Sequence, residues 1–168
     1  MEKKLVRHSY SSRAIPPEIH PVETLEHASL KDLFSAWTSL RGNVPYPEKP
    51  AALLSQIKPL ISHLHLTEVV DQGADFRFRL IGEEVFPGLR EHQVGKLITE
   101  HPDHGVRLRF LMLLRATYGA KRPVRGLSHR LTEESQYNYR IESLWLPFGR
   151  DREVNRILAM SVFERSNG

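Results

Sequence analysis

Apolar residues recur every three or four positions in two long stretches, and this spacing predicts two amphipathic helices. The first covers residues 30–41, behind Ser29, whose hydroxyl can cap a helix; Gly42 is the expected stop. The second is expected to begin after the capping residue Asp103 and to end at Gly119. Its predicted buried face consists of Val106, Phe110, Leu113, Leu114 and Tyr118. Its arginines, Arg107, Arg109 and Arg115, are expected to reach solvent.

Alternation of apolar and polar residues predicts five strands. The clearest is 75–81, with Phe76, Phe78 and Leu80 on one face and Arg77 and Arg79 on the other. It is expected to pair antiparallel with residues 60–70 through a turn at 71–74, which contains Asp and Gly. The remaining predicted strands are 123–131, 137–148 and 153–164. A short helix at 51–57 is expected before the first strand.

The last predicted strand is apolar on both faces. Leu158, Met160 and Val162 lie on one face, and Ile157, Ala159 and Phe163 lie on the other. Such a strand belongs in the middle of a sheet that is covered on both sides. The pattern therefore predicts an α+β fold with five strands, in the order two strands, helices and three strands, and with an N-terminal helix over the outer face of the sheet.

The first 28 residues show little periodicity. Pro16, Pro17 and Pro21 disfavour a helix there, so residues 1–28 are predicted to form a flexible N-terminal arm, ordered at most in part. Residues 29–165 are predicted to form a single domain, which is an ordinary size for one hydrophobic core.

Composition excludes several classes of chemistry. The chain has no cysteine, so disulfides, cysteine-ligated metal centres and cysteinyl flavin are excluded. The formal net charge of +4 comes from scattered basic residues, and we expect no nucleic-acid binding. No apolar run is long enough for a secretory signal or a membrane span. We therefore expect a cytoplasmic protein that does not insert into a membrane.

Four short motifs carry a resemblance to a known family. They are Trp37–Thr38–Ser39–Leu40–Arg41 followed by Val44–Pro45, then Phe78–Arg79–Leu80–Ile81–Gly82, then Val94–Gly95–Lys96, and finally Leu146–Pro147–Phe148. In this order they resemble the bacterial PAS-like family, common in alphaproteobacteria, whose N-terminal helix ends Trp-x-x-x-Arg. The chain departs from the family at Glu83, where a small hydroxyl residue is usual.

The resemblance implies a PAS-like five-stranded antiparallel sheet with helices on one face, and a pocket between the sheet and these helices. The residues expected to line it are Phe78, Arg79, Glu83, His92, Phe110 and Leu114. His92 is a possible haem ligand, but PAS domains without haem are far commoner, so the cofactor stays unassigned. Arg77 and Arg79 can bind an anion, although pairing with Glu68 or Glu142 across strands is the favoured interpretation.

Histidines and the first helix raise two further hypotheses. His101 and His104 are three residues apart, and His63 and His65 share a strand face, but no metal site is expected. The apolar face of the first helix either packs on its own sheet or also contacts a second copy. The candidate dimer residues are Leu30, Leu33, Phe34, Trp37 and Leu40.

The resulting functional hypothesis is a stand-alone PAS-like sensory module, a homodimer whose conformation responds to a small metabolite or to a signalling partner protein. The alternative is a ligand-free adaptor for protein interaction or dimerisation. A small α+β enzyme would need His92 to converge with Glu83 or Glu84, and no nucleophile elbow or phosphate-binding loop is present. The chain is therefore not expected to be an enzyme.

Overall fold

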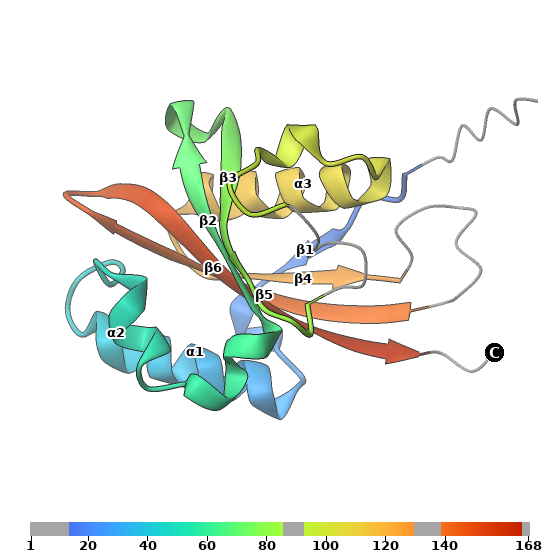
Figure 1. Ribbon diagram of the computed structural model, residues 1–168. Helices are drawn as coiled ribbons and strands as arrows, with labels where there is room; N and C mark the ends of the chain where they lie inside the picture. Colours follow the sequence, from blue (N-terminus) through green and yellow to red (C-terminus); the bar gives the residue numbers. More distant parts are fainter. Residues whose placement is uncertain (1–13, 86–92, 130–138, 166–168) are drawn as a thin grey trace, which may run out of the picture.

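A computed structural model describes residues 14–85, 93–129 and 139–165. They form an antiparallel sheet between helices (Figure 1). The strands are β1 (Glu18–His20), β2 (Leu64–Val70), β3 (Asp75–Ile81), β4 (Val124–Ser128), β5 (Tyr139–Arg150) and β6 (Glu153–Arg165). The α-helices are α1 (Ala28–Arg41), α2 (Pro50–Leu54) and α3 (His104–Ala120). Short 3-10 helices are η1 (Val22–Thr24), η2 (Lys58–His63), η3 (Asp71–Gly73) and η4 (Ile98–Glu100).

The six strands follow the order β1-β4-β5-β6-β2-β3. Every neighbouring pair is antiparallel. The prediction that 153–164 lies inside the sheet is confirmed, since β6 has β5 on one side and β2 on the other. The predicted number of five strands is one too few. The additional strand is β1, which comes from the segment predicted as an arm and pairs with β4.

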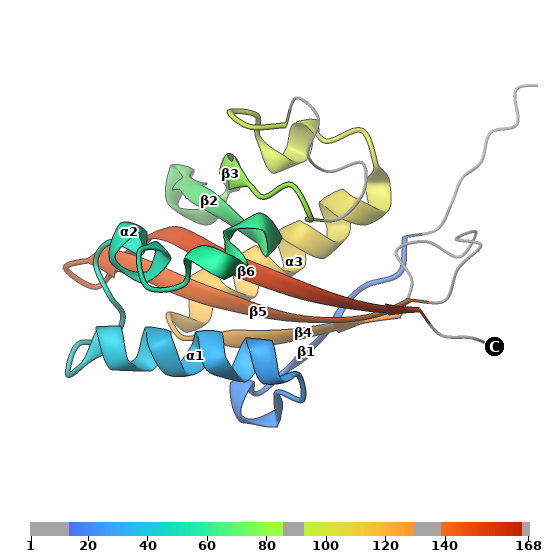
Figure 2. The ribbon, with the colours of Figure 1, turned by 60° about the horizontal axis from the view of Figure 1, so that its bottom comes forward.

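Helix α1 covers one face of the sheet and α3 covers the other (Figure 2). On the α1 side, the buried Trp37 indole Nε1 donates to the Pro147 carbonyl, 3.1 Å away. The helix begins at Ala28 rather than after Ser29, and the side chain of its N-cap residue, His27, makes no capping hydrogen bond. Instead the Glu142 carboxylate of β5 accepts the backbone amides of Glu26 and His27, just before the first turn.

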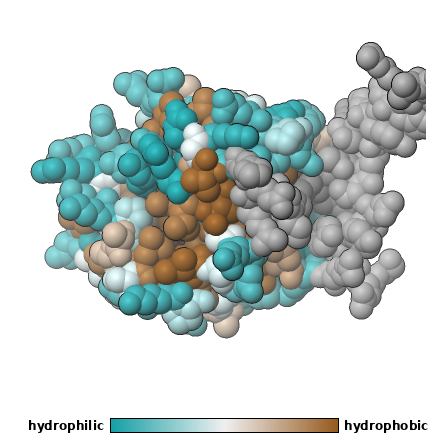
Figure 3. All heavy atoms as spheres, viewed as in Figure 1, coloured by the Kyte–Doolittle hydropathy of each residue, from teal (hydrophilic) through white to brown (hydrophobic). Residues whose placement is uncertain are grey.

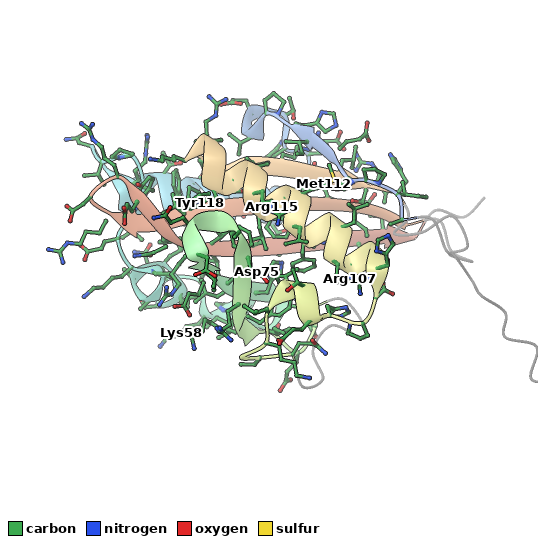
Figure 4. All side chains as sticks on the ribbon, turned by 90° about the horizontal axis from the view of Figure 1, so that it is seen from above. Lys58, Asp75, Arg107, Met112, Arg115 and Tyr118 are labelled. Carbon is green, nitrogen blue, oxygen red and sulfur yellow. The ribbon has the colours of Figure 1, made fainter. Side chains whose placement is uncertain are left out.

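Helix α3 is anchored at both ends. At its start the Asp103 carboxylate accepts the Val106 amide at 3.0 Å, so the predicted cap is confirmed. At its other end Arg115 donates to the Ala74 carbonyl at 2.9 Å. Tyr118 lies against Gly73 in the β2–β3 turn. Figure 4 shows both side chains beside this turn, and the contacts hold the helix across the sheet.

On the face seen in Figure 1, apolar residues reach the surface near the centre and are surrounded by hydrophilic ones (Figure 3). Several apolar side chains that pack against the core are only partly buried, among them Phe34, Leu54 and Leu66. The best-buried large side chains are Trp145, Phe76, Phe78 and Phe148, all on strands of the sheet.

Candidate functional site

Two polar side chains are buried between α3 and the sheet, where an apolar core would be expected. His65 of β2 is 1% exposed, and Arg109 of α3 is 4% exposed. The His65 ring lies 4.9 Å from the Phe110 ring and 5.0 Å from the Trp145 ring, measured between centroids. The Arg109 guanidinium carbon lies 5.7 Å from the centroid of each of these two aromatic rings. The four side chains form one cluster, the interior site.

The guanidinium of Arg109 is a cation without an anionic partner in the described part of the chain. Its Nη2 donates to the Ser161 Oγ at 3.2 Å. Its buried Nε has no hydrogen-bond partner there, and no described carboxylate lies within 4.0 Å of the group. Burial lowers the pKa of Arg109 to about 10, which still leaves it charged at neutral pH. An unpaired buried charge opposes folding, so this one needs an explanation.

His65 is the second unsatisfied group. Neither Nδ1 nor Nε2 has a hydrogen-bond partner among the described residues. Burial, together with the nearby charge of Arg109, lowers the pKa of His65 to about 3. The imidazole is therefore neutral at physiological pH, with one nitrogen as a donor and the other as an acceptor.

A surface cleft of about 420 Å³ has Ser161, the hydrogen-bond partner of Arg109, in its lining. It forms where β2 stops: the last β2–β6 pair is Leu64 with Met160, so the following residues of β6 have no described strand on that side. The cleft is lined by Ser29, Leu60, His63, Glu84, Met160, Ser161, Val162 and Phe163. Ser161 belongs to both features, because its hydroxyl accepts the Arg109 hydrogen bond. Ser161 thus contacts the buried cation and also belongs to the lining of the cleft.

Three of the six expected ligand residues lie in the interior between α3 and the sheet. These are Phe78, Phe110 and Leu114, which are all buried. The rings of Phe78 and Phe110 pack edge to face at 5.6 Å. Glu83, in contrast, is exposed beyond the end of β3. His92 lies outside the described residues.

Arg79 is not part of the interior site. It follows Phe78 in β3, so its side chain lies on the opposite face of the sheet, where it is exposed and pairs with Glu68. Cross-strand pairing of Arg77 and Arg79 with Glu68 or Glu142 is the favoured interpretation, and it is confirmed for Arg79 with Glu68. Arg77 instead donates to the Gly95 carbonyl at 2.8 Å. Glu142, the other carboxylate considered, pairs instead with Arg125 of β4.

The sequence interpretation missed both polar residues of the interior site. Arg109 was expected to reach solvent, and this expectation is wrong. It follows Val106 by three positions and precedes Leu113 by four, so it belongs to the same buried face of α3. The helical spacing therefore contained the signal. His65 was grouped with His63, but His63 belongs to η2 and pairs with Glu84, whereas His65 is inside.

The residues proposed for a dimer interface are mostly used within the chain. Leu30, Leu33 and Trp37 are buried against the chain's own sheet and leave almost no surface for a second copy. Phe34 and Leu40 are only partly buried. Of the five residues predicted for the interface, these two side chains remain partly accessible.

The other candidate features are simpler. Within the described ranges, no group of three or more His, Asp or Glu side chains is placed to hold a metal ion. His101 Nδ1 accepts the Asp103 amide at 3.0 Å, and a nitrogen of Arg107 lies 3.3 Å from His104 Nδ1. Among the described helices, none has the length and apolar character needed to cross a bilayer.

Comparison with known proteins leaves the family open. No family model, no curated protein and no solved structure matches this chain. The resemblance to PAS-like proteins therefore depends on the short motifs and on the order of elements alone.

Proposed function

We propose that this chain is a PAS-like sensory module that binds a small ligand between α3 and the sheet. The order of elements supports the proposal: β2 and β3 form an antiparallel pair, a helical segment ending in α3 follows, and β4 to β6 complete the sheet. Helix α1 covers the outer face, as expected from the two apolar faces of the last strand (Figure 2). Strand β1 is an addition at one edge.

The observation that carries the proposal is the polar interior site. A ligand-free adaptor has no need for His65 and Arg109 in its core, because each buried polar group without a partner costs about 1–3 kcal/mol. Apolar side chains of similar volume in place of an unpaired ion are often neutral or stabilising. A ligand that satisfies both side chains gives them a role. Buried polar groups of this kind are typical of binding sites.

The two rival functions are less well supported. A filled core would favour the adaptor, but the interior holds a charge without a described anionic partner and an imidazole without a described hydrogen-bond partner. The enzyme hypothesis needs His92 to meet Glu83 or Glu84, and both carboxylates are exposed outside the interior site. We keep a homodimer as part of the proposal, with Phe34 and Leu40 as the residues of α1 available for contact.

Native mass spectrometry of freshly purified protein tests this function. We expect a mass above that of the bare chain, the excess being lost under denaturing conditions, and a dimer as the main species. Removal of the bound molecule should lower the unfolding temperature, because a ligand that binds only the folded state stabilises it. A bare chain, together with an unfolding temperature that no metabolite raises, would contradict the proposal. A monomer at high concentration would contradict its dimeric part.

A further inference from the structure

The interior site has the charge of a receptor for a single negative group. Arg109 is the one buried cation of the cluster, and within the described residues its guanidinium donates one hydrogen bond, to the Ser161 hydroxyl. A guanidinium carries five N–H donors in a planar fork that matches a carboxylate. His65 is neutral and adds a hydrogen-bond donor but no charge. One cation balances a monoanion, whereas a phosphate dianion would leave a negative charge buried.

The adjoining cleft suits an apolar body. Four of its lining side chains are apolar, namely Leu60, Met160, Val162 and Phe163. Its volume, about 420 Å³, is within the range of small-molecule sites. The single carboxylate in its lining belongs to Glu84, which is already engaged by His63 Nε2 at 2.8 Å and by the Ser62 hydroxyl at 3.3 Å. The Glu84 carboxylate is therefore already bound by two side chains of the protein.

We infer that the ligand is an apolar monocarboxylic acid whose carboxylate binds Arg109 and whose body occupies the cleft beside β6. Ser161 joins the two parts. Its hydroxyl accepts from Arg109 and can donate its own hydrogen to the ligand's carboxylate. The His65 N–H supplies a further donor in the same interior. This inference rests on the proposed function and names the chemistry of its ligand.

Matched ligand pairs test the chemistry. Isothermal titration of the full chain, freed of any bound molecule, would compare octanoate and 4-phenylbutyrate with their primary amides and with octyl phosphate. We expect the acids to bind at least about 10-fold more tightly than the amides, because a charge-assisted hydrogen bond is lost in the amide. Equal binding of acid and amide, tighter binding of the phosphate, or no binding of either acid would overturn the inference.

Variants of Arg109 test the site. Arg109→Met should lose acid binding by about 10- to 100-fold while the unfolding temperature stays the same or rises, because an unpaired buried charge is removed. Arg109→Lys keeps the charge and should bind more tightly than Arg109→Met. Arg115→Met, the same change on an exposed arginine of α3, is the matched control and should bind normally. Unchanged binding by Arg109→Met would overturn the inference. If that variant does not fold, Arg109→Lys and Ser161→Ala take its place: each should weaken acid binding at least several-fold, and unchanged binding by both would overturn the inference.

The two proposals fail in different ways. If a neutral molecule is retained by the purified chain and the acids do not bind, the carboxylate inference is wrong and the sensory module stands. If no molecule is retained and none binds, both are wrong.

Discussion

Replacement of Glu142 should lower the free energy of unfolding, and the size of the loss tests the buried contacts of its carboxylate. Its carboxylate is fully buried in β5 and accepts three groups at once. Arg125 Nε of β4 donates at 2.7 Å, the His27 amide at 2.8 Å and the Glu26 amide at 3.1 Å. It therefore ties two strands to the segment that leads into α1. Glu142→Gln keeps the shape of the side chain and removes its charge.

The size of the effect follows from what is left behind. Arg125 is only 5% exposed, and after the substitution its nearest carboxylate is Glu26 at 3.5 Å. Removing one member of a buried ion pair costs about 3–5 kcal/mol, because the other charge stays buried. The control is Glu164→Gln, whose carboxylate is half-exposed and pairs with His27. An exposed pair of this kind is worth less than about 1 kcal/mol.

Urea unfolding measures both variants, and pH gives a second reading. Burial alone would raise the pKa of Glu142, but the bonds from His27, Arg125 and Glu26 outweigh it and hold the pKa below its ordinary value. The stabilisation is therefore complete above the unfolded pKa of about 4.3 and is lost as pH falls toward the folded pKa. The difference between wild type and Glu142→Gln should be constant from pH 6 to 8 and shrink below that unfolded value. A loss of under about 1 kcal/mol at pH 7, no larger than that of the Glu164→Gln control, would refute the reasoning.

Two further effects on stability follow from buried geometry. His65 has a pKa of about 3 in the folded chain and about 6.5 in the unfolded chain, so between these values the unfolded chain binds one more proton. As the pH is lowered from 6 to 4, the free energy of unfolding should therefore fall by about 1.4 kcal/mol per pH unit. His65→Phe should reduce this slope by that amount in urea titrations, and an unchanged slope would contradict it. Gly73→Ala should destabilise by about 1–3 kcal/mol, because φ is +89° and the new Cβ would lie 2.6 Å from the Tyr118 ring. Its control is Gly119→Ala in α3, where a Cβ meets nothing within 4 Å; equal unfolding midpoints would argue against the contact.

Local signals in the sequence predicted most elements. Strand β3 has the predicted bounds, because its alternation is strict and turn residues precede it. Helix α3 begins after the predicted cap, Asp103, since capping is a local interaction. Helix α1 ends at Arg41 before Gly42, as expected, with a positive φ at the glycine.

What the sequence did not reveal depends on long-range contacts. Strand β1 has three residues and no alternation of its own, and it exists because β4 offers a free edge. Pairing of Glu142 with Arg125 depends on β4 lying beside β5, which local patterns do not specify. Arg109 is different, because its spacing places it on the buried face of α3. The charge of Arg109 favours an exposed position, but the helical spacing correctly indicates that it is buried.

The central claim is that the interior site beside Arg109 holds a small molecule. Native mass spectrometry of wild type and Arg109→Met, purified in parallel, tests this most directly. The account predicts that the wild type carries a small molecule that ionises as an anion when released, and that Arg109→Met is bare. Two bare proteins, or the same molecule on both, would contradict it.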